Sequence, residues 1–217
     1  MRIKYWSDYA CPYCYIGETN LRHALDELDI MYEFEMKAFE LDPNAKRSAG
    51  GDVVAMFAAK YQLDLDGARE KIRLMNEMAH EAGLDFDYSK VFHTNTFDAH
   101  RLTKLAFDRG GQKAADEMAE RLYKAYFKES LDLGDVEALV RLGEEKGLDP
   151  GEIRTMLEGK DYMEAVKLDE REAQIQRISS VPCFIINEKL AIPGAMTKGQ
   201  FMEAIKKYFP EEIPVAI

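Results

Sequence analysis

The sequence has few of the residues that define several common classes of protein. Three cysteines in 217 residues are too few for a disulfide scaffold. Lys and Arg number 29 against 40 Asp and Glu, which gives a net charge of −11. Because a phosphate backbone requires clustered positive charge, this balance argues against a nucleic-acid partner.

Long apolar runs are also missing. No stretch approaches the ~20 apolar residues of a membrane span, so we expect no membrane partner. Residues 1–6 lead directly into a strand-like pattern and leave no room for the apolar run of a signal peptide. We therefore expect a cytoplasmic protein, in which two closely spaced cysteines are typically catalytic or metal-binding.

The two ends of the chain carry alternating strand and helix patterns. Residues 3–7 predict a strand, and residues 12–28 predict a helix with one apolar stripe. Residues 32–37 alternate between apolar and charged side chains, which predicts a half-buried strand. The C-terminal part predicts, in order, a helix over 161–178, strands at 183–186 and 190–192 joined by a turn at Glu188-Lys189, and a helix with a capping-box pattern at Thr197 and Gln200.

Between these ends the patterns are helical throughout. Asp135 is suited to cap one helix, and Asp149-Pro150 to open another. No low-complexity linker or repeat interrupts the chain. The sequence therefore predicts an α/β domain built from residues 1–45 and 160–217, with an all-helical domain, residues 46–159, inserted in its middle.

Cys11-Pro12-Tyr13-Cys14 lies where the first predicted strand leads into the first helix. A thiolate is the attacking species, and a free thiol with a pKa of about 8.5 is mostly protonated at neutral pH. Unpaired N–H groups at a helix N-terminus stabilise a nearby anion, so we expect Cys11 to be the nucleophile and Cys14, one turn further on, the resolving thiol. Pro12 suits the first helical position.

A zinc half-site is the rival interpretation of this motif. Zinc needs four ligands, and no second Cys-x-x-Cys or paired histidines follow, so only Cys183 with a scattered histidine could complete a site. The strand-to-helix context favours redox chemistry, and we expect no metal.

Pro182 opens an apolar strand, a position that proline tolerates. The simpler interpretation is a strand-start turn. The alternative is a cis Val181–Pro182 bond beside Cys11, which leaves the backbone of Val181 free to pair with an extended substrate. The local sequence does not decide between them.

Three motifs in order resemble the DsbA-like branch of the thioredoxin superfamily, and within it the FrnE-like oxidoreductases and the related 2-hydroxychromene-2-carboxylate isomerases. They are Asp-Tyr-Ala-Cys-Pro-Tyr-Cys-Tyr-Ile-Gly at 8–17, Asn-Thr-Phe-Asp-Ala-His-Arg at 95–101, and Val-Pro at 181–182 followed by Ile-Pro-Gly-Ala at 192–195. The resemblance spans nearly the whole chain. It implies a thioredoxin-like fold with a helical insertion.

The resemblance also implies that Cys11 attacks, Cys14 resolves and Pro182 is cis. Two positions depart from it. Tyr13 stands where tryptophan is expected, and the two middle residues of such a motif tune the redox potential. Cys183 stands where an apolar residue is usual. We expect a small buried thiol there, and a third redox partner is the alternative.

The segment 95–101 is open to two interpretations. Asn95 and Thr96 could bind substrate backbone, with His100 as a proton relay. We favour a helix start, with Thr96 or Asp98 as the cap and His100 packed against the other domain.

The leading hypothesis is a thiol–disulfide oxidoreductase that needs no cofactor beyond the Cys11–Cys14 disulfide. Its partners would be proteins or peptides with thiols or disulfides, or glutathione. One alternative is a glutathione-dependent isomerase or transferase, for which Cys14 would be dispensable. A second is a non-catalytic module that binds a peptide or a metal.

Overall fold

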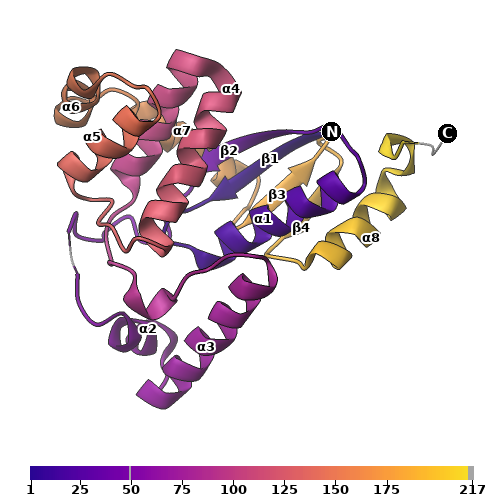
Figure 1. Cartoon of the computed structure of the whole chain (residues 1–217), viewed down its shortest axis with the longest axis horizontal. Helices are drawn as coiled ribbons and strands as arrows, with labels where there is room; N and C mark the ends of the chain where they lie inside the picture. The colour runs from indigo at the N-terminus through magenta and orange to yellow at the C-terminus, as the bar shows by residue number, and fades with distance from the viewer. Residues whose placement is uncertain (49, 215–217) are drawn as a thin grey trace.

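The computed structural model describes residues 1–48 and 50–214 and contains one mixed four-stranded sheet (Figure 1). The strand order is β2-β1-β3-β4. β1 (Arg2–Ser7) runs parallel to β2 (Glu33–Ala38) and antiparallel to β3 (Cys183–Ile186), and β4 (Leu190–Pro193) is antiparallel to β3. The first and last parts of the chain therefore meet in the middle of the sheet.

Helices cover both faces of this sheet. α1 (Pro12–Glu27) and α8 (Lys198–Tyr208) pack on one face, where Tyr5, Phe34 and Phe184 are fully buried (Figure 1). α7 (Met163–Ile175) and the first part of α4 (Phe97–Phe127) pack on the other, where the Trp6 indole donates to the Asp169 carbonyl at 3.0 Å. Side-chain alternation along β1 thus divides the core into two layers.

The described elements between β2 and β3 are all helical. In chain order they are α2 (Val53–Tyr61), α3 (Leu65–Glu81), η1 (Tyr88–Lys90), α4, α5 (Val136–Glu145), α6 (Pro150–Glu158) and α7. A short 3-10 turn, η2 (Pro210–Glu212), follows α8 near the C-terminus. α2 and α3 project together from one end of the molecule, and α5 and α6 pack beside α4 (Figure 1). α4 bends at Gly111, whose φ of 69° is non-helical.

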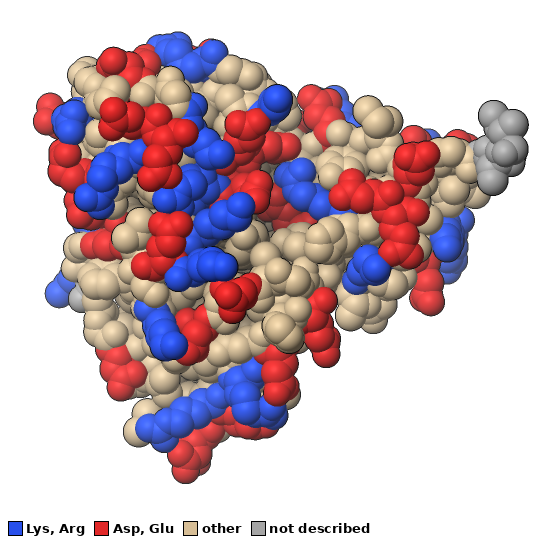
Figure 2. All heavy atoms as spheres, viewed as in Figure 1, with Lys and Arg blue, Asp and Glu red and all other residues tan. Residues whose placement is uncertain are grey.

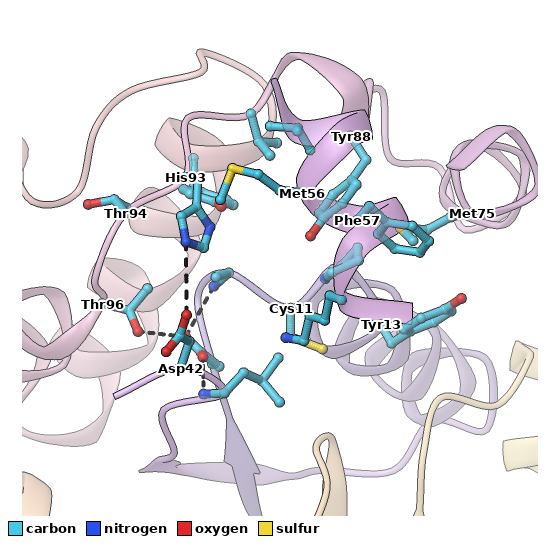
Figure 3. A pocket seen from close by; sticks show the side chains of 18 of the residues that line it. Cys11, Tyr13, Asp42, Met56, Phe57, Met75, Tyr88, His93, Thr94 and Thr96 are labelled. Atoms are coloured by element: carbon cyan, nitrogen blue, oxygen red, sulfur yellow. Dashed lines mark hydrogen bonds and ion pairs between the residues drawn. The ribbon is translucent and has the colours of Figure 1, made fainter. Parts of the chain in front are cut away.

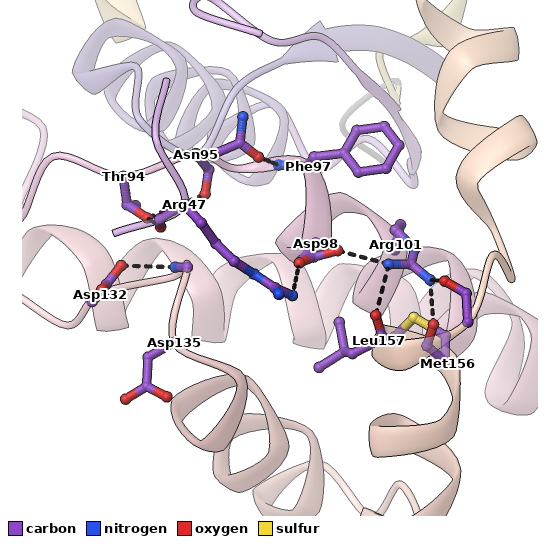
Figure 4. Close-up of polar contacts among 12 residues, drawn as sticks. Arg47, Thr94, Asn95, Phe97, Asp98, Arg101, Asp132, Asp135, Met156 and Leu157 are labelled. Atoms are coloured by element: carbon purple, nitrogen blue, oxygen red, sulfur yellow. Dashed lines mark hydrogen bonds and ion pairs between the residues drawn. The ribbon is translucent and has the colours of Figure 1, made fainter. Parts of the chain in front are cut away.

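The buried side chain of Arg101 joins two of these helices. Its guanidinium lies at the C-terminal end of α6, where backbone carbonyls have no partner within the helix (Figure 4). It donates to the carbonyls of Met156, Leu157, Gly159 and Asp161 and to the carboxylate of Asp98. A positive charge here stabilises the end of α6 and holds it against the start of α4.

The helices and strands expected at both ends of the chain are confirmed, as are the caps at Asp135 and Asp149 and the capping box of α8. The expected hairpin at Glu188-Lys189 is confirmed, with a turn over residues 187–189 between β3 and β4. Asn187 and Glu188 are its two left-handed residues, with φ of 47° and 55°, a conformation that matches the twist of the strands that they join.

The face of the molecule in Figure 2 carries interspersed acidic and basic side chains and no large area of one sign. Within the described residues no helix is long and apolar enough to cross a membrane.

Candidate active site

Cys11 and Cys14 lie at the junction of β1 and α1, as the sequence predicts. Cys11 is the N-cap of α1, with extended backbone at φ −94° and ψ 109°, and Pro12 takes the first helical position. The Cys11 N–H donates to the Asp8 carbonyl at 3.0 Å, which closes the turn after β1. All three cysteines are free thiols, and the Cys11 and Cys14 sulfurs are in contact.

The Val181–Pro182 segment, far away in sequence, lies against Cys11. The Cys11 thiol is 3.7 Å from the Val181 carbonyl oxygen, and the Val181–Pro182 peptide bond is cis. Gly17 permits this proximity, because a Cβ there would lie 3.2 Å from the Ala195 Cα and 3.3 Å from the Pro182 ring. A larger residue at position 17 would push α1 away from the loop that carries Pro182.

The environments of the two thiols differ. Cys14 is completely buried, and burial raises the pKa of its thiol well above the ordinary value, with a further rise from Cys11. The Ser7 hydroxyl and the Asp8 backbone N–H contact the same sulfur and lower its pKa in part. Cys11 is also buried, at 3% exposed, but it borders a cavity that Cys14 does not line.

That cavity has a volume of about 360 Å³ and lies between α1, α2 and the loop before α4. In Figure 3 apolar and aromatic side chains line one side and polar side chains the other, with Cys11 and Tyr13 at its edge. The labelled wall residues are Met56, Phe57, Met75 and Tyr88 on the apolar side, and Asp42, His93, Thr94 and Thr96 on the polar side. Tyr13 is 39% exposed, so the cavity opens beside the motif.

Asp8 is a buried carboxylate that sequence reasoning missed as a separate feature. It accepts hydrogen bonds from the Leu41 N–H at 2.6 Å, the Ala10 N–H at 3.1 Å and the Thr96 hydroxyl at 2.7 Å. Burial raises its pKa, and these donors lower it in part. An acidic residue directly after a buried strand and before the cysteines was the available signal.

The segment 95–101 supports this carboxylate. The expected helix start is confirmed, with Thr96 at the N-cap position of α4. The Thr96 side chain makes no capping hydrogen bond, because it donates to Asp8 instead. The Asn95 side chain instead accepts from the Phe97 N–H at 2.9 Å, because the buried carboxylate needs the threonine hydroxyl (Figure 4). Asp98 binds Arg101.

His100 is buried and stacks on Tyr9, with ring centroids 4.7 Å apart. Burial lowers its pKa to about 3, so the ring is neutral at neutral pH. Its Nε2 lies 3.9 Å from Asp8. Thr96 lines the cavity at Cys11, whereas Asn95 and His100 do not.

Cys183 pairs with Trp6 across the sheet, so strand alternation directs it to the face that α7 covers. Burial raises the pKa of its thiol. It does not line the cavity at Cys11. Among the residues that the structure describes, no three His, Cys, Asp or Glu side chains are grouped as a metal site would require.

Comparison with known proteins agrees with this geometry. Residues 2–206 match the family of DSBA-like thioredoxin domains. A probable DsbA oxidoreductase from Streptomyces coelicolor is 31% identical and superposes with a TM-score of 0.88, over 100% of this chain and 93% of that one.

Two solved structures share the fold at lower identity. The 2-hydroxychromene-2-carboxylate isomerase is 16% identical with a TM-score of 0.64, over 95% of this chain and 94% of its own. The cytosolic disulfide reductase DsbM from Pseudomonas aeruginosa is 15% identical with a TM-score of 0.63, over 100% of both chains. The predicted α/β class and thioredoxin-like fold are thus confirmed, and the chain belongs to the family of DsbA-like thioredoxin domains.

Proposed function

We propose that this chain is a cytoplasmic thiol–disulfide oxidoreductase in which Cys11 attacks and Cys14 resolves. The observation that carries the proposal is the unequal placement of two touching thiols. Cys11 caps a helix and borders a cavity, whereas Cys14 is enclosed one turn further on. A thiol that borders a cavity, with a second thiol behind it, suits exchange chemistry, in which one thiol attacks the substrate and the other resolves the mixed disulfide.

In this reaction the Cys11 thiolate attacks a substrate disulfide, forms a mixed disulfide and releases the first substrate thiolate. Cys14, after losing its proton, attacks the Cys11 sulfur, closes the Cys11–Cys14 disulfide and releases the second thiolate. Two electrons pass from the protein to the substrate. The reverse sequence oxidises substrate thiols, and no further cofactor is needed.

The substrates would be thiols or disulfides of proteins, peptides or glutathione. The cavity admits the group next to the substrate sulfur, with Pro12 and Tyr13 at its edge and the Val181 carbonyl at hydrogen-bond distance from Cys11. Its volume lies in the range of small-ligand sites, so it takes one side chain or a small thiol and excludes a folded domain.

A Cys14→Ser variant tests the assignment. After reaction with a disulfide peptide it should accumulate a mixed disulfide on Cys11, visible by mass spectrometry, whereas the wild type should contain a Cys11–Cys14 bridge. Cys11→Ser should abolish both products. Full exchange activity in Cys11→Ser would overturn the proposal.

The two alternatives are tested by this variant and by the metal content of the reduced protein. Isomerase turnover that survives Cys14→Ser unimpaired would favour a glutathione-dependent isomerase. Stoichiometric zinc in the reduced protein would favour a metal-binding module.

A further inference from the structure

A second cavity, of about 700 Å³, lies along α1 behind the thiol pair. Among the described residues it shares no lining side chain with the cavity at Cys11. Glu18 and Arg22 of α1 line it, together with Asp116 and Tyr123 of α4. Cys14 precedes Glu18 by one helical turn of α1.

Hydroxyl groups connect Cys14 with this second cavity. The Ser7 hydroxyl contacts the Cys14 sulfur and is also hydrogen-bonded to the Tyr123 hydroxyl. All three side chains are fully buried or nearly so, and Tyr123 borders the cavity. A chain of exchangeable protons therefore runs from the enclosed thiol to the cavity.

Two polar atoms near the end of this chain have no hydrogen-bond partner among the described residues, although both are buried. They are the Tyr5 hydroxyl and Oε2 of Glu18. Oε1 of Glu18 accepts two hydrogen bonds from Arg22, at 2.8 and 3.0 Å, and Arg22 also lies 3.5 Å from Asp116. Glu18 also interacts with the Tyr5 hydroxyl, whose pKa is raised by burial and then by this carboxylate. Oε2 is the Glu18 oxygen that Arg22 does not hold, so it keeps the lone pairs at which a proton can bind.

We propose that Ser7 and Tyr123 relay the proton of the Cys14 thiol to Glu18 in the second cavity. The inference rests on the proposed function, since it concerns the step in which Cys14 attacks the mixed disulfide. Burial keeps this thiol protonated at neutral pH. Its proton must therefore leave before the attack, and the side facing Cys11 is occupied by the substrate sulfur.

The thiol proton passes to Ser7 Oγ as Ser7 gives its own proton to the Tyr123 oxygen. The Tyr123 proton passes through solvent in the cavity to Oε2 of Glu18. The Cys14 sulfur then bonds to the Cys11 sulfur, and the Cys11–substrate bond breaks with its electron pair on the substrate thiolate. In the opposite direction Glu18 returns the proton to Cys14.

The two steps can be timed separately with 4,4′-dithiodipyridine in stopped flow. Attack by Cys11 releases one thiopyridone, and resolution by Cys14 releases a second. In Tyr123→Phe and Ser7→Ala we expect an unchanged first release and a second release at least tenfold slower at pH 7. The deficit should shrink as the pH approaches 10, where hydroxide removes the proton directly.

Glu18→Gln tests the end of the relay without touching the hydroxyls and should show the same pH-dependent deficit. Tyr9→Phe is the matched control, because it removes another buried hydroxyl, bonded to Thr103, and should leave both releases unchanged. Wild-type second-release rates in the relay variants, or a deficit that is equal at every pH, would overturn the relay. No release from the reduced wild type would instead contradict the proposed function, and the relay with it.

Discussion

The Thr96 hydroxyl donates to the Asp8 carboxylate at 2.7 Å, joining the turn before Cys11 to the start of α4 across 88 residues of sequence. Asp8 also accepts from the N–H groups of Ala10 and Leu41. One buried carboxylate thus connects three segments around the cavity at Cys11. Removal of one of its hydrogen-bond donors should therefore lower the free energy of unfolding by a measurable amount.

Thr96→Val should destabilise the protein by about 1–2 kcal/mol in urea titrations at pH 7, because a buried charged acceptor loses its side-chain donor. Burial already raises the pKa of Asp8, and removal of Thr96 should raise it further. The donor favours the ionised form, so the deficit should grow as the pH rises from 4 to 7. Thr155→Val, at an exposed hydroxyl, is the control, and an equal effect in both variants would contradict this account.

Arg101→Met should cost about 3 kcal/mol or more in the free energy of unfolding. The variant leaves several carbonyls at the end of α6 without a donor, and a buried unsatisfied group costs about 1–3 kcal/mol. Arg69→Met, at a side chain that is 60% exposed, should change stability by less than about 0.5 kcal/mol. Equal midpoints for the two variants would show that Arg101 does not hold α6.

Gly134→Ala should destabilise the protein by about 2 kcal/mol or more. An added Cβ would lie only 1.4 Å from the Arg47 carbonyl oxygen, so one of the two backbone segments must move. Gly199→Ala adds the same methyl group inside α8, where it would meet no atom within 4 Å apart from its chain neighbours and the backbone of its own helix, and should be stabilising by up to about 1 kcal/mol. Thermal unfolding of both variants checks the contrast, and a stable Gly134→Ala protein would refute the predicted clash.

Glu40 and Glu170 form a half-buried carboxyl pair. Burial, followed by the charge of Glu170, raises the pKa of Glu40 to about 7, and burial raises that of Glu170. A raised pKa in the folded state means that the contribution of Glu40 to stability is full below its unfolded pKa, about 4.3, and is lost as the pH rises toward 7.

Replacement of Glu40 by Gln should therefore flatten the pH dependence of the melting temperature between pH 5 and 8 by about 2 °C, since solvent screens a half-exposed pair. Glu170→Gln should have a smaller effect on the titration of Glu40, because it removes the charge of Glu170 but leaves the burial that is the larger cause of the raised pKa. The double variant should show less than the sum of the two single effects, because each single change already removes the shared repulsion. Additive effects would mean that the two carboxyls titrate independently.

Several features were predictable from the sequence because their signals are local. Pro12 after Cys11 indicates a helix start, and the Thr197–Gln200 capping box lies within one turn of α8. The alternation of apolar and charged side chains in β2 and the apolar stripe of α1 depend on residues a few positions apart. At the start of α4 the sequence predicts Thr96 as the cap residue, but not the hydrogen bond from its hydroxyl to Asp8, because the two residues are 88 positions apart and no local pattern connects them.

By itself the sequence determined the Cys-Pro-Tyr-Cys motif, its place at a helix start and the strand and helix order around it, because backbone geometry and periodicity act over short separations. Only the tertiary structure decided what surrounds the two sulfurs. The parallel pairing of β1 with β2 and the return of β3 place Val181 beside Cys11, Thr96 on Asp8, and Ser7 between Cys14 and Tyr123. These contacts join residues up to 170 positions apart, so burial and hydrogen bonding in the folded core select them.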